Sequence, residues 1–434
     1  MDRHRLDDLR AYIYRTHDGG KTWQLVSRGI SEGAYVNVVR EDPKRQGLLY
    51  AGTELGMYVS FNDGDDWQPL QLNLPVASVR DIAIHENDLV VATHGRAFWV
   101  LDDISPLREV EPKLAAQPAH LFKPQVAVRV RPGSDQGTPF PLETPHGDNP
   151  PNGAILDYYL KSAASTPITL EILDSEGVLV RRYASDDKVA AVDEKSLQIP
   201  LYWIHPMQPL SATAGMHRFV WDLHYTSPLP ASARRSRRSG VDGPWAPPGQ
   251  YTVRLTVEGK AYTQPLALGM DPRVKATPAD LEMQFKLAQQ SAMALAEVSL
   301  AFAQASGITE QVQRLELKTK DNPTINQALV DFEHRLGQIV GPPFLGYGLP
   351  VTPLDTDQSS LRHLVATFTE LRAAVESADA APTREQETAL EKDKAALEST
   401  MAQWQQLLAH DLPSLNSQLK QVGMSEIGLE NNTK

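Results

Sequence analysis

The residues best placed to do chemistry in this chain are acidic and amide side chains that recur in two turns, Asp18 in the first and Asn62 with Asp63 in the second. Glycoside hydrolysis uses a pair of carboxylates as acid, base or nucleophile. The same side chains also accept hydrogen bonds from turn amides. Because a turn that repeats along a chain is expected of a structural unit and not of a single active centre, we interpret Asp18 and its counterpart as turn-forming residues. The catalytic residues, if any, stay unknown.

Both turns lie in hairpins of one design. A short strand, 12–15 or 57–60, leads into a turn with Gly, and a second strand, 23–26 or 67–70, opens on Trp. The glycines allow positive φ, and Trp covers the turn with apolar surface. The copies lie 44 residues apart, from Asp18 to Asn62, a period typical of β-propeller blades. The structural turn residues are Thr16, Asp18, Gly20, Thr22, Trp23, Ser60, Asn62, Gly64 and Trp67.

The pattern Ser/Thr-x-Asp-x-Gly-x-Thr-Trp resembles the Asp box of bacterial neuraminidase (BNR) repeats. These repeats occur in sialidases, in sortilin-type propellers and in large bacterial proteins often labelled as glycosyl hydrolases. The first copy, Thr16 to Trp23, matches the motif at every position, whereas the second has Asn62 for Asp and Asp66 for Thr or Ser. The resemblance covers about a quarter of the chain, residues 1–110, and implies the C-terminal blades of a BNR-type propeller.

The remaining blade strands follow from the alignment of the two copies. Residues 35–39 match 78–82 as an inner strand, 48–53 match 88–93 as the next strand, and 98–101 form the third strand of a further blade. This gives about two and a half blades, whereas a closed propeller needs at least ~4. We expect the remainder of the propeller to come from upstream sequence; completion of the ring by other chains is the alternative.

Antiparallel pairing brings the start of each inner strand beside the end of the second strand, and the Asp turns then face the opposite rim. Six side chains gather on the first rim and are the candidate residues for binding a glycan or protein ligand: Asn37, Glu54, Arg80, Asp81, His94 and Arg96. The alternative is that they form surface salt bridges of little consequence. In the sialidases that the motif resembles, three arginines hold the substrate carboxylate and a Tyr/Glu pair acts as nucleophile; only Arg80 and Arg96 qualify for the arginine role here.

The rest of the chain changes period twice. Residues 111–151 are expected to be a linker and loop, and alternating apolar residues with intervening turns predict an Ig-like β-sandwich over 152–272. Thr277 and Pro278 open a helical pattern, so an antiparallel helical bundle is predicted over 276–422, followed by a polar tail, 423–434, that frays. The predicted fold class is therefore multidomain, mainly β then α, with a partial β-propeller, an Ig-like β-sandwich and a C-terminal helical bundle.

Other groups that could carry chemistry have simpler interpretations. Asp102 and Asp103 follow a strand and are expected to form a turn, and Trp404 is expected in the helical core. The basic run 234–238 lacks interleaved aromatics and predicts an exposed loop. His217, Asp222 and His224 flank one strand without the spacing of a metal site. We expect no metal and no cofactor.

Composition narrows the classes of function. The net charge of −12 argues against nucleic-acid binding, no stretch approaches the roughly 20 apolar residues of a membrane span, and no cysteine is present. Residues 1–8 lack the apolar core of a signal peptide, which leaves the compartment open: periplasmic or secreted if the full-length protein carries one. We expect a carbohydrate- or protein-binding module or scaffold; the alternative is a glycoside hydrolase, sialidase-like or glucan-processing, whose catalytic residues lie mainly in upstream blades.

Overall fold

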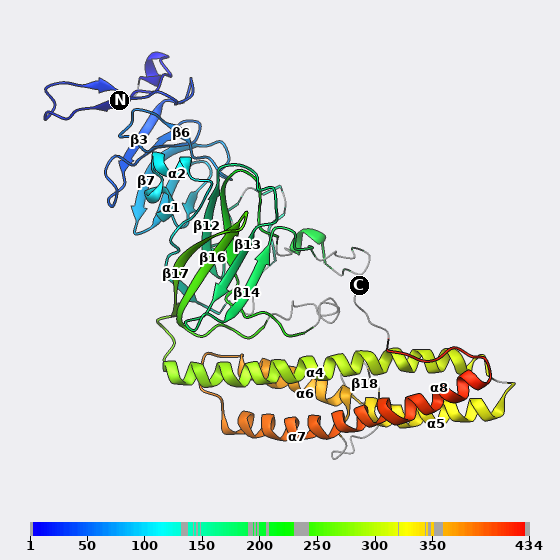
Figure 1. Cartoon of the computed structure of the whole chain (residues 1–434). Coiled ribbons are helices and arrows are strands. Elements are labelled where there is room, and N and C mark those ends of the chain that lie inside the picture. The colour runs from blue at the N-terminus through cyan, green and yellow to red at the C-terminus, as the bar shows by residue number, and fades with distance from the viewer. Residues whose placement is uncertain are drawn as a thin grey trace. The chain divides into compact units, whose positions relative to one another are not determined.

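The computed structural model divides the chain into two compact units, Met1–Asp222 with Gly249–Asp271, and Leu223–Pro248 with Pro272–Lys434. Sheets dominate the first unit and helices the second (Figure 1), so the order of β then α is as the sequence predicts. The residues that the structure describes are 3–131, 138–141, 143–144, 146–147, 149–189, 194, 197, 199–204, 208–229, 243–319, 321–342, 344–345, 349–350 and 359–429.

Three small antiparallel sheets begin the first unit. The first pairs β1 (Tyr14–Arg15) with β2 (Gln24–Leu25). The second has four strands in chain order: β3 (Val36–Glu41), β4 (Leu49–Thr53), β5 (Met57–Ser60) and β6 (Gln68–Pro69). The third has three strands: β7 (Ser78–His85), β8 (Asp88–His94) and β9 (Phe98–Leu101). The second and third sheets share one hydrophobic core, in which Tyr50 and Val79 are fully buried.

The second and third sheets meet along their first strands. The Asn37 amide on β3 donates to the Val79 carbonyl on β7 at 3.0 Å, and the Arg40 guanidinium donates to the Ile82 carbonyl at 3.1 Å. Gly52 on β4 is required here, because a Cβ at this position would come within 2.5 Å of a Val79 methyl group. Strands β3 and β7 are therefore held together closely from sheet to sheet.

Two larger sheets complete the first unit. One orders β10 (Ala119–Leu121), β12 (Ala154–Leu160) and β15 (Gly215–Trp221). The other is a curled five-stranded sheet: β11 (Ala127–Arg129), β17 (Lys260–Met270), β16 (Gly249–Val257), β13 (Thr169–Leu173) and β14 (Leu179–Ala184). The sheets face each other through ring contacts, Trp221 with Tyr251 and Tyr183 with Phe219. The parallel pairing of β11 with β17 is the one exception to antiparallel order among the described strands.

The segment 111–151, expected to be a linker, contributes two of these strands, β10 and β11. It also contains the helix α2 (Pro112–Ala116), which follows α1 (Ser105–Glu109). Its proline and glycine content suggests an irregular segment, but Leu121 and Ala127 are buried and supply the apolar contacts that fix each strand. Tertiary packing here overrides a composition typical of loops.

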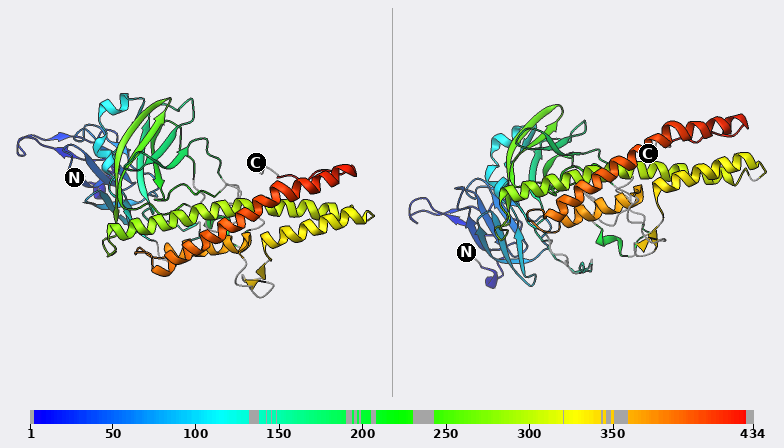
Figure 2. Two further views of the ribbon diagram at one scale, coloured as in Figure 1. Left: turned by 60° about the horizontal axis from the view of Figure 1, so that its bottom comes forward. Right: turned by 90° about the horizontal axis from the view of Figure 1, so that it is seen from below.

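Long helices build the second unit: α4 (Pro278–Glu316), α5 (Pro323–Val340), α6 (Leu361–Val375), α7 (Arg384–Gln406) and α8 (Leu412–Gln421). The helices α5, α6 and α7 lie along α4 (Figure 2), and α8 packs on α5. Thr277 and Asp280 form a capping box at the start of α4, which satisfies amides that the first turn leaves unpaired. A π-helical turn, Leu407–Asp411, joins α7 to α8 just before Pro413, which has no amide to donate.

Among the described residues, α4 is the one helix long and apolar enough, by composition alone, to cross a membrane. Its buried residues, Val298 and Ala305 among them, line the core of the helical unit together with Phe332, Phe368 and Trp404. Of its most apolar 18-residue stretch, 39% is buried.

The expectation that the polar tail frays does not hold for residues 423–429. Ile427 is buried, and the Asn416 side chain on α8 bonds both its amide and its carbonyl at 2.8 Å. The Gln311 side chain on α4 likewise bonds both backbone groups of Gly428. Two side-chain amides thus hold the tail in place, a pairing of distant residues that local composition does not show.

Candidate ligand-binding rim

Two β-bulges position the candidate rim residues. On β3, Val36 pairs with Thr53 and Val38 with Gly52, which leaves Asn37 as the extra residue. On β7, Val79 pairs with Thr93 and Asp81 with Ala92, which leaves Arg80 as the extra residue. A bulge redirects the side chain that it inserts, and such bulges are frequent beside functional sites. The same irregularity at equivalent positions of two sheets aims Asn37 and Arg80 at one end of both sheets.

Glu54, directly after β4, is the centre of a polar cluster at that end. The Ser78 hydroxyl donates to its carboxylate at 2.6 Å, and a guanidinium nitrogen of Arg80 lies 3.5 Å from it. The Tyr35 hydroxyl lies near enough to the Glu54 carboxylate for the two groups to influence each other electrostatically. Arg80 reaches the Asn37 side-chain oxygen at 3.5 Å as well. We call these five residues, Tyr35, Asn37, Glu54, Ser78 and Arg80, the rim cluster.

The rim cluster fixes the charge of its members. Burial alone would raise the pKa of Glu54, but hydrogen bonds from Ser78 and Tyr35 and the Arg80 charge outweigh it and lower that pKa below its usual value. Burial, followed by the Glu54 carboxylate, raises the pKa of Tyr35. Glu54 is therefore a carboxylate at neutral pH, and Tyr35 is a neutral hydroxyl beside it.

The structure places three of the six predicted rim residues, Asn37, Glu54 and Arg80, in this cluster. Asp81 points elsewhere and pairs with Arg40 at 2.7 Å, because the bulge at Arg80 turns the next residue to the other side. His94 is the cross-strand partner of Ser78 and borders the cluster. The remaining residue, Arg96, lies in the turn after β8, where its amide donates to the Thr93 hydroxyl.

Tyr35 and Ser78 belong to the cluster but are absent from the sequence-based set of rim residues. Both stand at the start of an inner strand, and the strand alignment pairs them with each other as equivalent positions. The pairing register supplies the missing signal: the Glu54 amide donates to the Tyr35 carbonyl at 3.0 Å, and Ser78 faces His94. Tyr35 and Ser78 are therefore the hydroxyl residues that lie opposite charged residues in the strand pairing.

The two Asp turns lie at the other end of the strands, where Leu49 pairs with Ser60. In the first turn, the Asp18 carboxylate accepts the Thr22 amide at 2.9 Å and the Thr22 hydroxyl at 2.8 Å. In the second, Asn62 accepts the Asp66 amide at 3.0 Å and donates its own amide to the Asp66 carboxylate at 3.1 Å. The two departures from the motif thus compensate each other, with donor and acceptor exchanged.

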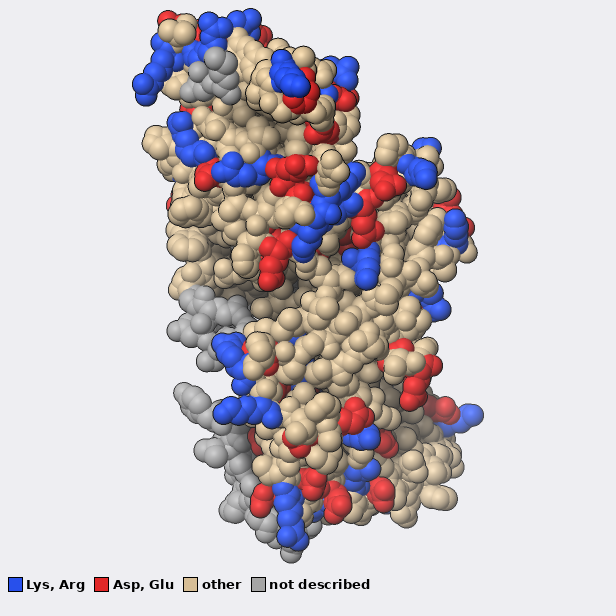
Figure 3. Space-filling model, turned by 90° about the vertical axis from the view of Figure 1, so that its left-hand side faces the viewer, with Lys and Arg blue, Asp and Glu red and all other residues tan. Residues whose placement is uncertain are grey.

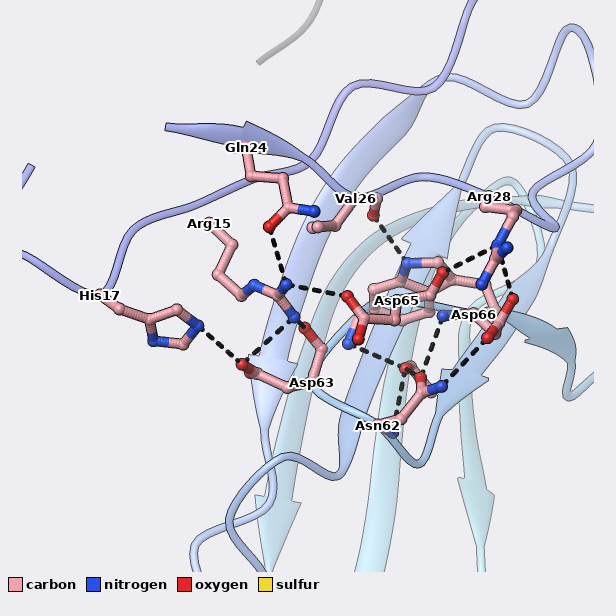
Figure 4. A network of polar contacts seen from close by, with 12 residues as sticks. Arg15, His17, Gln24, Val26, Arg28, Asn62, Asp63, Asp65 and Asp66 are labelled. Atoms are coloured by element: carbon pink, nitrogen blue, oxygen red, sulfur yellow. Dashed lines mark hydrogen bonds and ion pairs between the residues drawn. The ribbon is translucent and has the colours of Figure 1, made fainter. Parts of the chain in front are cut away.

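The second turn also holds the first hairpin in place (Figure 4). Arg15 on β1 bonds Asp63 and Asp65, and Arg28 bonds Asp66 at 2.7 Å. The Trp67 indole donates to the Val26 carbonyl at 2.9 Å. These carboxylates accept bonds that join neighbouring hairpins, which supports a structural role for the Asp turns.

The other candidate groups are equally accounted for. Asp103 accepts from Ser105, and the Arg218 guanidinium donates to the carbonyls of Asp102 and Asp103. The His217 ring contacts the Thr213 carbonyl, and Asp222 lies 3.8 Å from Arg181. Within the described residues, no group of three potential metal ligands is found. The basic run 234–238 lies outside the described residues.

Charges of both signs are interspersed on the face of the molecule shown in Figure 3, with no field of a single sign over it. The comparisons with known proteins give no relative to set beside this geometry. No family model matches the chain, and no curated protein matches it. The rim cluster has to be interpreted from its own chemistry.

Proposed function

We propose that this chain is the C-terminal part of a BNR-repeat propeller protein and that it binds a carbohydrate or protein ligand at the rim cluster. The observation that carries the proposal is the pair of equivalent bulges, which bring Asn37 and Arg80 together around Glu54. A lone exposed ion pair contributes about 0–1 kcal/mol and needs no function. Two repeated backbone irregularities that converge on one carboxylate are a more specific arrangement.

The propeller assignment rests on how the small sheets meet. β3 and β7 are each the first strand of an antiparallel sheet, and they bond to each other through Asn37 and Arg40. Innermost strands of adjacent blades are expected to meet in this way. β1 and β2 correspond in the repeat to β5 and β6, so we propose that they are the third and fourth strands of a further blade.

A cavity of about 400 Å³ beside β1 supports that assignment. Residues of β1 and β3 line it, Tyr14 and Asn37 among them. Tyr14 is 43% exposed, whereas its counterpart in the second copy, Tyr58, is 7% exposed beneath the neighbouring strands. Further strands of that blade would cover the exposed Tyr14 side of β1. In the same proposal, the two facing sheets act as an Ig-like module and the helices as a bundle, both scaffolding the propeller.

The ligand class follows from the donors that the rim cluster offers. The Arg80 guanidinium lies 3.5 Å from the Asn37 side-chain oxygen and 3.5 Å from the Glu54 carboxylate, which are long contacts. The group carries five N–H donors. It can therefore turn toward a carboxylate or hydroxyl of a ligand without losing a strong bond. The Tyr35 ring is buried and stacked on His4 at 4.8 Å, so it supports the cluster, and the exposed Arg80 is the group left to meet a ligand.

One observation favours the glycoside hydrolase alternative: Tyr35 and Glu54 interact electrostatically, and they are the residue types of the Tyr/Glu pair in the sialidases that the motif resembles. A tyrosine nucleophile, however, must lose its proton readily, and burial together with Glu54 raises the pKa of Tyr35 instead. The protonation state therefore favours binding over catalysis by this chain alone.

Glycan and peptide arrays probed with the full chain test the proposal. Ligands found in this way are then measured against Arg80→Ala and against Arg28→Ala, an exposed arginine at the opposite end of the strands. A hydrogen bond to a charged group contributes about 1.5–3 kcal/mol, which corresponds to a loss of about tenfold to hundredfold for Arg80→Ala and no loss for Arg28→Ala. If Arg80→Ala bound every ligand with unchanged affinity, the proposal that the rim cluster binds the ligand would be wrong.

The hydrolase alternative has its own readout. Release of reducing sugar or sialic acid by the chain, abolished in Tyr35→Phe, would favour catalysis. Binding without release would favour the module.

A further inference from the structure

Strand β9 has a neighbour on one side only. Its counterpart in the preceding sheet, β5, lies between β4 and β6, whereas β9 pairs with β8 alone. The Thr93 amide donates to the Ala97 carbonyl at 3.0 Å. Because backbone groups of an antiparallel strand point to alternate sides, the backbone amides and carbonyls of Trp99 and Leu101 also point toward β8. The backbone amides and carbonyls of Phe98 and Val100 point away from β8. Across the described residues, these outward groups have no hydrogen-bond partner.

The side chains on this edge are apolar and exposed. Phe98 is 76% exposed and Val100 is 51% exposed, and both lie on the same face of the strand. Trp99, on the other face, packs against the core shared by the second and third sheets and lies next to Gly147. Every residue of β5, in contrast, is buried. A bare apolar edge is a template for another strand.

The residues of this face are self-complementary when the strand is read in both directions. In order they are Arg96, Phe98, Val100 and Asp102. If two copies of β9 pair antiparallel with the two Trp99 residues on the symmetry axis, Phe98 of each copy lies opposite Val100 of the other, and the outward amides and carbonyls of these residues bond reciprocally. Aromatic with β-branched residues is a favourable cross-strand pair.

The same register brings opposite charges together at both ends. Arg96 of one copy meets Asp102 of the other. Ala97, with φ of 56°, turns the chain just before β9, so the long Arg96 side chain has to span the last step. Burial, followed by the nearby Asp88, raises the pKa of Asp102 although Arg218 lies close, and a further cation would relieve this carboxylate.

We infer that β9 forms an interface with β9 of a second copy of this chain and joins the two three-stranded sheets into one of six strands. A C2 contact of this kind uses the same patch on both molecules. One strand pair buries less than the ~1,200 Å² of a standard interface, so the dimer is concentration-dependent. The inference is independent of the rim cluster, because it uses only the free edge of the third sheet.

Sedimentation of the full chain over a wide concentration range tests the interface. The expected mass rises from 47.9 kDa toward twice that value. Val100→Lys, which places a charge opposite the apolar Phe98 of the other copy at both ends of the pairing, is expected to stay at the single mass at every concentration. Val76→Lys is the matched control, since Val76 is 73% exposed and lies outside the strands; it is expected to dimerise like the parent. Circular dichroism verifies that both variants fold.

A charge exchange distinguishes this register from any other association. Arg96→Asp alone and Asp102→Arg alone each oppose like charges at both ends, so each is expected to stay monomeric. An equimolar mixture of the two variants restores opposite charges in the mixed pair and is expected to dimerise. A parent that stays monomeric at all concentrations, or single variants that dimerise as the parent does, would overturn the inference.

Discussion

Trp23 and Trp67 occupy the same position of the repeat, and the structure predicts opposite consequences for their removal. The Trp67 side chain is 3% exposed and packs with Ile13, Val26 and Tyr58. Its indole donates to the Val26 carbonyl in the preceding hairpin at 2.9 Å. Trp23 is 60% exposed, and its indole bonds only the Gly20 carbonyl of its own turn. Trp67 therefore joins two hairpins, whereas Trp23 covers one turn.

The expected magnitudes follow from burial. Trp67→Ala removes a large buried side chain and leaves a cavity, which costs about 3–5 kcal/mol of the free energy of unfolding. Trp67→Phe keeps most of the packing but leaves the Val26 carbonyl unpaired, at a cost of about 1–3 kcal/mol. Trp23→Ala, at an exposed position, costs about 1 kcal/mol or less.

Hydrogen exchange followed by mass spectrometry is the suitable assay, because a chain of two units need not unfold in one step. A loss of 3 kcal/mol reduces the protection of the β4 and β5 amides by about 100-fold. Amides of the helical unit serve as an internal reference. If Trp23→Ala lowered protection of β4 and β5 as strongly as Trp67→Ala, the account of how the hairpins pack would be refuted.

Two further predictions concern charged groups. Hydrogen bonds from the Thr22 amide and hydroxyl lower the pKa of Asp18 to about 2. The stability that the Asp18 carboxylate contributes to its turn is therefore present above pH 4 and is lost as the pH falls toward 2. NMR titration of the turn amides should show this step in the parent and not in Asp18→Asn, which copies the uncharged Asn62 of the second turn. Arg108→Ala leaves the fully buried Asp42 carboxylate without its cation and should cost about 3–5 kcal/mol. Arg40→Ala removes an exposed pair with Asp81 and one hydrogen bond to the Ile82 carbonyl, so it should cost only about 1–2 kcal/mol. Denaturant unfolding of the first unit distinguishes the two variants, and equal losses would contradict the burial argument.

Local signals in the sequence account for the hairpin turns and for the helix starts. Asp18 and Thr22, and likewise Thr277 and Asp280, are residues whose bonds join neighbours within four positions, so residue type and spacing specify them. The same reasoning places Glu54 beside Arg80, because antiparallel pairing of consecutive strands follows from their order.

What the sequence could not supply depends on contacts between distant segments. Asp81 leaves the rim because of a one-residue bulge, and a bulge has no composition of its own. β10 and β11 form in a proline-rich segment because other strands receive them, and Ile427 is held by Asn416 on α8. The exchange of donor and acceptor between Asn62 and Asp66 could be read in the sequence only after the geometry of the first turn was known.

The central claim is that the rim cluster binds a ligand through Arg80. Isothermal titration of the strongest array ligand into the parent, Arg80→Ala and Arg28→Ala measures it most directly. The account predicts that Arg80→Ala loses about tenfold to hundredfold in affinity while Arg28→Ala binds as the parent does. Equal affinity of all three proteins, or an equal loss in both variants, would contradict it.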